Sequence, residues 1–184
     1  YRELHHRVKN NLQIILSIIE LQSYKVDDKL KEEFKKLENR IKSISKTHEL
    51  LYLNENIEKI NMYEYLYILS EDVIVSFNKD IDIFIKTNLK IPLKIAVYLG
   101  IIVNELLSNS MKHTNCNSIT ISLKRKNKEY ILRYLDNGQG YKDGQVFEHS
   151  LGLKLVNNLV KLQLMGEINT NCNNKCEYII RFKI

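Results

Sequence analysis

Residues 93–113, LKIAVYLGIIVNELLSNSMKH, are the stretch of sequence from which the fold can be worked out. Pro92 stands directly before this stretch, and proline is favoured at a helix entrance because its fixed φ suits the first turn. We therefore predict one long helix over Leu93–His113. Within it, Glu105, Asn109 and Lys112 recur at steps of four and three, which places them on one helical face.

Helix and strand patterns alternate on both sides of this helix. Residues 62–77 predict a helix, and alternating isoleucines from Ile81 to Ile85 predict a strand. Further along we expect strands over 119–123, 130–134, 167–171 and 177–184, and a helix over 151–165. Helices combined with paired strands are typical of a two-layer α/β sandwich.

The first sixty residues follow a different pattern, in which apolar residues recur at alternating steps of four and three. They are Val8, Leu12, Ile15 and Ile19, then Leu30, Phe34, Leu37, Ile41, Ile44 and Leu51, with one polar break at His48. The connection 23–28 contains an aspartate that can cap the second helix. We predict an antiparallel helical hairpin whose wide apolar face requires a second copy, giving a dimeric four-helix bundle. The change of periodicity divides the chain into domains 1–56 and 57–184.

Composition excludes several classes of protein. With 184 residues, 44% of them hydrophobic and 27% charged, the chain can form a packed core, so overall disorder is excluded. The longest apolar stretch, 95–103, is too short to cross a bilayer. Because no leader is visible and the first residue is Tyr1, we expect a cytoplasmic piece of a longer protein, which as a whole could be soluble or membrane-tethered.

The basic and sulfur-containing residues suggest two further sites, and we favour neither. The net charge of +6 comes from scattered lysines, and the single basic run, 124–128, is expected at a hairpin tip, so we expect no direct contact with nucleic acid. Three cysteines without a secretory signal predict no disulfide framework. A zinc site is an alternative, but residues 173–175 favour a turn between two strands. Its ligands would be His113, Cys116, Cys172 and Cys176.

Two helical segments carry residues suited to phosphate chemistry. Residues 3–12, ELHHRVKNNL, contain two adjacent histidines, and a neutral imidazole can act as a nucleophile near pH 7 and hold a phosphoryl group. In the long helix, the oxygens of Glu105 and Asn109 suit Mg²⁺, and Lys112 suits a phosphate. A pair of surface histidines and an ordinary amphipathic helix are the alternatives.

Two glycine-bearing segments follow. Asp136–Gly140, DNGQG, comes directly after a strand, where glycine lets the backbone approach a ligand and the aspartate can accept a hydrogen bond from an exocyclic amine. Taken alone, it is also compatible with a simple turn. Ser150–Val156, SLGLKLV, opens a helix, whose free amides can bind phosphate, although Ser150 stands where a Gly-x-Gly pattern has its first glycine.

The order of these four segments, HRVKNNL, NELLSNSMKH, DNGQG and SLGLKLV, resembles the H, N, G1 and G2 boxes of sensor histidine kinases. The H box, in which Arg-x-Lys-Asn follows the histidine, is similar to that of the non-classical branch related to the HWE kinases. Unlike HWE members, this chain has no Trp and has Asn104 before the N-box glutamate. The resemblance implies a HisKA_2-type dimerisation and phosphoacceptor hairpin, followed by a Bergerat-type ATP-binding sandwich of the HATPase_c type.

The resemblance also assigns roles to single residues. His6 is implied as the phosphoacceptor, with His5 as the fallback, and Glu105 as an orienting or activating residue. Asn109 is implied as the Mg²⁺ ligand. The remaining ATP-binding residues are Lys112 and His113 near the phosphates or sugar, Asp136 at the adenine amine, Gly138 and Gly140 along the nucleotide, and Ser150, Leu151, Gly152 and Leu153 at the phosphates, after a lid over 141–150.

The implied reaction is autophosphorylation of a histidine by ATP, followed by transfer of the phosphoryl group to an aspartate of a response regulator. The implied partners are a second copy of the chain, an upstream sensor domain and a regulator, for which RNA-binding antiterminators are candidates. Alternatives are a catalytically silent ATP-binding scaffold, a regulator phosphatase using Asn10, a nucleic-acid binder and a dimerisation adaptor without nucleotide.

Overall fold

The computed structural model describes residues 2–24, 26–28, 59–139 and 151–184, and the separate positions 30, 31, 34, 35, 37, 38, 41, 42 and 45. For residues 2–7, 9 and 151 it describes the backbone alone. The chain divides into two compact units, Tyr1–Asn56 and Ile57–Ile184, which are treated separately below. None of the described helices is both long and apolar enough to span a membrane.

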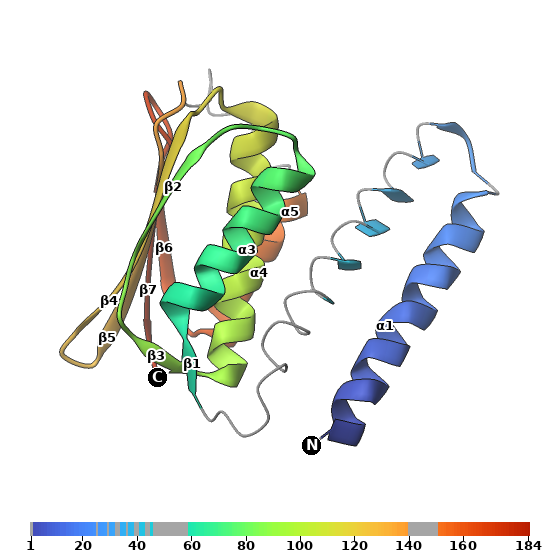
Figure 1. Cartoon of the computed structure of the whole chain (residues 1–184), viewed down its shortest axis with the longest axis horizontal. Coiled ribbons are helices and arrows are strands. Elements are labelled where there is room, and N and C mark those ends of the chain that lie inside the picture. The colour runs from blue at the N-terminus through green and yellow to red at the C-terminus, as the bar shows by residue number, and fades with distance from the viewer. Residues whose placement is uncertain are drawn as a thin grey trace. The chain divides into compact units, whose positions relative to one another are not determined.

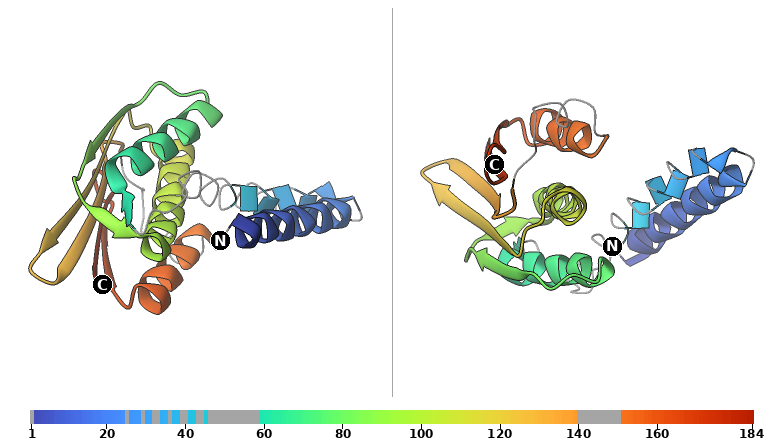
Figure 2. Two further views of the ribbon diagram at one scale, coloured as in Figure 1. Left: turned by 60° about the horizontal axis from the view of Figure 1, so that its bottom comes forward. Right: turned by 90° about the horizontal axis from the view of Figure 1, so that it is seen from above.

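The first unit contains a long helix, α1 (Arg2–Ser23), and a second helical run after a short turn. The described positions between 28 and 45 are helical and run back alongside α1 (Figures 1 and 2). Asp27 caps the second run, since its Oδ1 accepts a hydrogen bond from the Leu30 amide at 2.9 Å. The predicted hairpin and its capping aspartate are therefore present. His48 and Leu51, the end of the predicted seam, lie outside the described residues.

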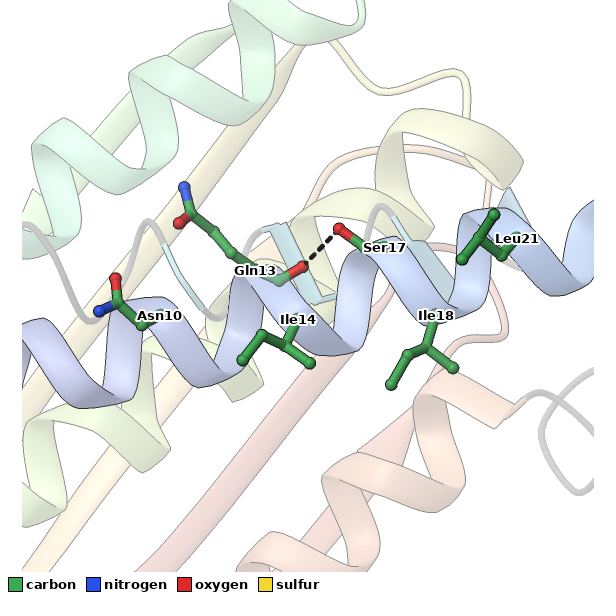
Figure 3. Close-up of a pocket in the computed structure, with 6 residues that line it drawn as sticks. All are labelled: Asn10, Gln13, Ile14, Ser17, Ile18 and Leu21. Atoms are coloured by element: carbon green, nitrogen blue, oxygen red, sulfur yellow. Dashed lines mark hydrogen bonds between the residues drawn. The ribbon is translucent and has the colours of Figure 1, made fainter.

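The apolar face of α1 is only partly covered within the unit. Ile19 is buried, whereas Ile14, Ile18 and Leu21 are more than half exposed. These three side chains line a surface depression of about 500 Å³ together with Asn10, Gln13 and Ser17 (Figure 3).

The second unit is built on a five-stranded sheet with the strand order β2-β4-β5-β7-β6. The strands are β2 (Asp82–Lys86), β4 (Ser118–Lys126), β5 (Glu129–Asp136), β6 (Glu167–Asn171) and β7 (Glu177–Lys183). Strands β2 and β4 pair in parallel, and all other neighbours are antiparallel. The helices α3 (Met62–Ser76), α4 (Leu93–His113) and α5 (Leu151–Asn158) lie on one face of this sheet (Figures 1 and 2). This is the predicted two-layer sandwich.

The core lies between α4 and the inner face of the sheet. Alternate residues of the central strands point inward and are buried, as the period of two requires. They are Ile119, Ile121 and Leu123 in β4, Leu132 and Tyr134 in β5, and Tyr178, Ile180 and Phe182 in β7. Helix α4 contributes Leu99, Ile102, Val103, Leu106 and Leu107, all fully buried. The buried strip of α4 thus fixes which of its sides face the sheet.

Helices α3 and α4 run in the same direction. Each follows directly on a short strand, β1 (Lys59–Asn61) or β3 (Lys90–Pro92), and these two strands pair with each other. At the other end, the Lys112 ammonium in the last turn of α4 lies 5.8 Å from the ring centroid of Phe77, the C-cap of α3. The carboxyl ends of the two helices therefore lie side by side (Figure 1).

Three features differ from the sequence-based expectations. The short β1–β3 pair was not predicted, because three residues carry no recognisable period. The predicted helix 151–165 is α5 followed by a π-helical turn, η1 (Leu159–Gln163), in which the Leu164 amide donates to the Leu159 carbonyl. The sequence predicts no disulfide framework, and the structure has one disulfide, between Cys172 and Cys176. The predicted turn between β6 and β7 brings these cysteines together, with their Cα atoms 4.0 Å apart.

Candidate functional site

Asp136, the last residue of β5, is the centre of a buried polar cluster at the end of the sheet. Its side chain is fully buried. The Ser110 hydroxyl of α4 donates to Asp136 Oδ2 at 2.5 Å, and the Gly138 amide donates to Oδ1 at 3.0 Å. The Asp136 amide donates to the carbonyl of Cys176 at 3.0 Å. The carboxylate is thus held by α4 on one oxygen and by its own loop on the other.

A second hydroxyl stands behind Ser110. The Tyr134 phenol donates to Ser110 Oγ at 2.9 Å and is fully buried. Burial raises the pKa of Tyr134 well above its ordinary value, which the hydrogen bond to Ser110 only partly opposes. The phenol therefore keeps its proton and acts as a donor.

Gly138 lies against Thr114, the C-cap residue of α4. A Cβ atom built on Gly138 would lie 2.6 Å from Thr114 Cβ and 3.2 Å from Asp136 Oδ1. No side chain larger than hydrogen fits there without displacing Thr114. The glycine thus keeps the loop after β5 close to Asp136 and to the end of α4.

Asn137 has a supporting role beside Asp136. Its Oδ1 accepts from the amides of Asn117 and Ser118, at 3.1 and 3.0 Å, and its Nδ2 donates to Asn117 Oδ1 at 2.6 Å. These bonds join the end of β5 to the start of β4. They keep the loop that carries Gly138 in place.

The predicted polar face of α4 is not the side of the helix that carries Ser110. Successive side chains on a helix point roughly 100° apart, so Glu105, Asn109 and Lys112 lie together and away from the sheet side. Glu105 is buried, and Asn109 Nδ2 is buried without a hydrogen-bond partner in the part of the chain described here. Lys112 lies beside Phe77, on the α3 side of the helix. Asn109 directly precedes Ser110 in the chain, whereas the Lys112 ammonium lies over the Phe77 ring.

Two titratable groups near this end of α4 are shifted. Burial, and to a smaller extent the charge of Lys112, lower the pKa of His113, so the imidazole is neutral at pH 7. Burial raises the pKa of Cys116, with the Asp136 charge acting in the same direction and Thr114 and Lys79 opposing it. His113 therefore supplies no positive charge of its own at neutral pH.

The other predicted site residues are described in part. Gly152 and Leu153 are buried in the first turn of α5, and Leu151 is described by its backbone there. The backbone at His5 and His6 is helical, within α1, but their side chains lie outside the description. Gly140, Ser150 and the predicted lid 141–150 also lie outside the described residues.

The zinc alternative loses two of its four ligands to the disulfide between Cys172 and Cys176. Across the described ranges, no three His, Cys, Asp or Glu side chains are grouped so that they could hold a metal ion.

Sequence reasoning missed Ser110 and Tyr134. Both have signals that could have revealed them: Tyr134 stands two residues before Asp136 and so shares its side of the strand, and Ser110 is a polar residue on the apolar strip of α4.

Two family descriptions match adjacent parts of the chain. Residues 3–77 match the family described as "Histidine kinase" (HisKA_2), and residues 95–184 match "Histidine kinase-, DNA gyrase B-, and HSP90-like ATPase". The chain belongs to the histidine kinases. The first match continues through α3, which the structure nevertheless packs with the sheet unit.

Curated proteins that are similar to this chain in sequence include sensor histidine kinases. This histidine kinase is 28% identical over 183 residues to sensor histidine kinase PdtaS of Mycolicibacterium smegmatis, which covers 91% of the chain and 36% of PdtaS. The PdtaS of Mycobacterium tuberculosis is 29% identical with similar coverage. Sensor protein VraS of Staphylococcus aureus is 37% identical over 65 residues, 35% of the chain. The chain thus spans about a third of the length of the PdtaS relatives.

Solved structures confirm the fold of this kinase. The blue-light activated histidine kinase EL346 of Erythrobacter litoralis aligns with a TM-score of 0.73 at 23% identity, covering 99% of this chain and 61% of that one. The isolated kinase domain of EL346 aligns with a TM-score of 0.68 at 16% identity, covering 94% and 95%.

Proposed function

We propose that this chain is the core of a two-component sensor kinase that uses ATP to phosphorylate its own histidine and then passes the phosphoryl group to an aspartate of a response regulator. The observation that carries the proposal is the buried Asp136, held as an acceptor by Ser110 and Gly138 at one end of the sandwich. In a member of the histidine kinase family, this arrangement fits recognition of the adenine amine.

The nucleotide would lie between α4, the loop after β5 and the start of α5. Asp136 would accept the exocyclic amine, and Gly138 would let the base approach the backbone, as would Gly140. The first turn of α5, with Leu151, Gly152 and Leu153, would lie at the phosphate oxygens, because the start of a helix carries a positive dipole end that favours negative charge. Ser150 would stand at the entrance to that turn, and Lys112 and His113 at the phosphates or sugar.

The residues of α4 fit a bound Mg²⁺. The Asn109 carboxamide is half-buried, and its Nδ2 has no partner among the described residues, so this donor is left for an acceptor such as a phosphate oxygen. Its Oδ1 would coordinate the ion, and Glu105, buried one turn earlier, would orient the amide or activate the site. A bound Mg²⁺ would offset the negative charge of the phosphate groups.

The phosphoryl transfer requires little covalent help from the protein beyond positioning. A ring nitrogen of His6 attacks the γ-phosphorus, the bond from that phosphorus to the bridging oxygen breaks, and ADP leaves with the electron pair. The ring proton passes to a base or solvent, and the product is a phosphoramidate. His5 is the alternative acceptor, because it directly precedes His6 in the sequence.

The proposed partners follow from the family and the helical unit. A second copy of the chain would cover the exposed Ile14, Ile18 and Leu21 of α1. A response regulator would receive the phosphoryl group, and RNA-binding antiterminator regulators are the finer candidates. A sensor domain would precede the chain. We expect this part of the protein to work in the cytoplasm.

The test is incubation with γ-labelled ATP and Mg²⁺. We expect wild type and His5→Ala to incorporate label, and His6→Ala and Asn109→Ala to lose it. The bond should be acid-labile and base-stable, as in a phosphoramidate. Label in His6→Ala but not in His5→Ala would move the acceptor by one residue. ATP binding without labelling in any variant would favour the silent scaffold, and no ATP binding would contradict the proposal.

A second activity, dephosphorylation of the regulator, is favoured by the exposed amide of Asn10 on α1, four residues after His6 (Figure 3). An amide at that spacing can orient a water molecule toward a phosphoryl group. Loss of regulator dephosphorylation in Asn10→Ala, with autophosphorylation kept, would support this activity.

A further inference from the structure

Asp136 is backed by two hydroxyl groups that the phosphoryl-transfer chemistry does not use. Ser110 Oγ lies 2.5 Å from Asp136 Oδ2, and Tyr134 Oη lies 2.9 Å from Ser110 Oγ. Ser110 is 2% exposed and Tyr134 is fully buried, so water does not compete for either hydroxyl. The three side chains form one chain of hydrogen bonds from β5 to α4 and back to β5.

The direction of these bonds follows from the number of protons. A carboxylate can only accept, so Ser110 donates its single hydroxyl proton to Asp136. Ser110 then has no proton for Tyr134, and the phenol must donate to it. The raised pKa of Tyr134 agrees with this, because it keeps the phenol protonated.

The bond from Ser110 to Asp136 is a departure from the usual behaviour of a helical serine. Such a serine commonly donates to the carbonyl four residues earlier in its own helix. Ser70 of α3 does so, with its hydroxyl 2.6 Å from the Leu66 carbonyl. Ser110 instead turns to the neighbouring strand, where the phenol of Tyr134 occupies its acceptor side.

We infer that Ser110, oriented by Tyr134, is a positioning residue that fixes the Asp136 carboxylate as the acceptor for the exocyclic amine of a purine nucleotide. With Ser110 on Oδ2 and the Gly138 amide on Oδ1, the carboxylate cannot rotate about its Cβ–Cγ bond without breaking a bond. Each oxygen keeps a further lone pair for the ligand. The inference rests on the proposed binding of ATP at this site.

The test compares ATP with purine riboside triphosphate, which differs by lacking the 6-amino group. Calorimetry with the full 184-residue chain and Mg²⁺ measures both dissociation constants. We expect wild type to prefer ATP by about tenfold, the value of one hydrogen bond to a charged group. In Ser110→Ala the preference should fall to within about twofold, because ATP binding weakens while binding of the analogue is unchanged. Tyr134→Phe should lower the preference in the same direction by a smaller factor.

Ser70→Ala is the matched control, because it also removes a buried hydroxyl from a helix of the same unit. It should leave the preference at the wild-type value. If Ser110 had only a structural role, Ser110→Ala would weaken both nucleotides equally, and an unchanged preference would overturn the inference. Circular dichroism checks folding. Should Ser110→Ala fail to fold, an unchanged preference in Tyr134→Phe would overturn the inference by itself.

The outcomes also separate this inference from the proposed function. If wild type binds neither nucleotide, the proposed function fails and the inference fails with it. If wild type binds both equally, ATP binding is kept but the role of the Asp136 carboxylate, and with it that of Ser110, is wrong.

Discussion

Asp136 is a buried carboxylate whose charge adds to the effect of burial on two neighbouring groups. Its carboxylate has donors on both oxygens and lies in a region where its neighbours Tyr134 and Cys116 have raised pKa values. Burial is the main cause for both neighbours, and the charge of Asp136 acts in the same direction. The Tyr134 hydroxyl and the Cys116 thiol therefore stay protonated, which leaves Asp136 as the negatively charged member of these three residues.

Cys116 gives a pH-dependent prediction at this scale. A raised pKa means that less thiolate is present at pH 8 than in an ordinary cysteine, so alkylation of the native chain should be slow and should increase as the pH rises above 9. Of the three cysteines, two are bonded to each other, so one thiol should react after denaturation without reductant. Thiol counting by mass after iodoacetamide checks both statements. Rapid labelling of native protein at pH 8, or three reactive thiols without reductant, would contradict them.

At the scale of single elements, the cap of the second helical run is decisive for the hairpin. Asp27→Ala removes the acceptor for the Leu30 amide and should destabilise this run by about 0.5–2 kcal/mol. Hydrogen–deuterium exchange read out by mass spectrometry should show faster exchange in residues 28–45 than in wild type.

Asp28→Ala is the neighbouring control for the cap. Asp28 makes an exposed ion pair with Lys31, 3.0 Å apart, and such pairs contribute little. Equal acceleration in the two variants would show that the cap is not the cause.

A long helix in which the apolar pattern repeats several times could be predicted from the sequence, whereas the three-residue strands and the irregular turn could not. The bounds of α4 agree with the sequence-based prediction, because Pro92 marks its start and an apolar pattern runs through it. The bounds of β6 agree as well, although only one of its five residues is apolar. The strands β1 and β3 were missed, since their pairing is a tertiary contact between three-residue segments. The turn η1 was missed because one extra residue per turn barely changes the apolar pattern.

The residues of the candidate site also fall into those that the sequence predicts and those that it does not. The positions of Asp136 and Gly138 after a strand, and that of Asn109 on the long helix, could be predicted from the sequence, and their binding roles stay predictions. Ser110 and Tyr134 could not be predicted with these, since their role depends on two hydroxyls meeting across the layer between α4 and β5. The disulfide was missed for a related reason, because an odd number of cysteines does not show which two meet in a turn.

At the scale of the whole molecule, the exposed face of α1 predicts self-association. Ile14, Ile18 and Leu21 are 58%, 52% and 63% exposed, and an apolar stripe of this kind on a hairpin is covered when two copies pair. Ile18→Glu should therefore weaken the dimer. Full burial of an isoleucine contributes about 1.5–3 kcal/mol, and about half of the Ile18 side chain is left for the dimer to bury. A two-fold interface counts this contribution twice, so the dissociation constant should rise by at least about tenfold.

Sedimentation velocity over a range of concentrations measures this change. Val75→Glu is the control, because Val75 is an exposed aliphatic residue of α3 in the other unit. A wild-type chain that stays monomeric at high concentration would contradict the predicted dimer, and an equal effect of both variants would show that the association is not specific to α1.

The shared direction of α3 and α4 has an electrostatic consequence. Each helix carries a negative partial charge at its carboxyl end, and these two ends lie side by side near Phe77 and Lys112. Basic side chains gather there: Lys112 and His113 occupy the last turn of α4, and the Lys79 ammonium donates to the Met111 carbonyl. With His113 neutral at pH 7, the two lysines provide the compensation. If Lys112 turns toward the phosphates of a nucleotide, the carboxyl ends of α3 and α4 lose one of the two positive charges that compensate their dipoles. The free energy lost at the helix ends then reduces the affinity of the chain for the nucleotide.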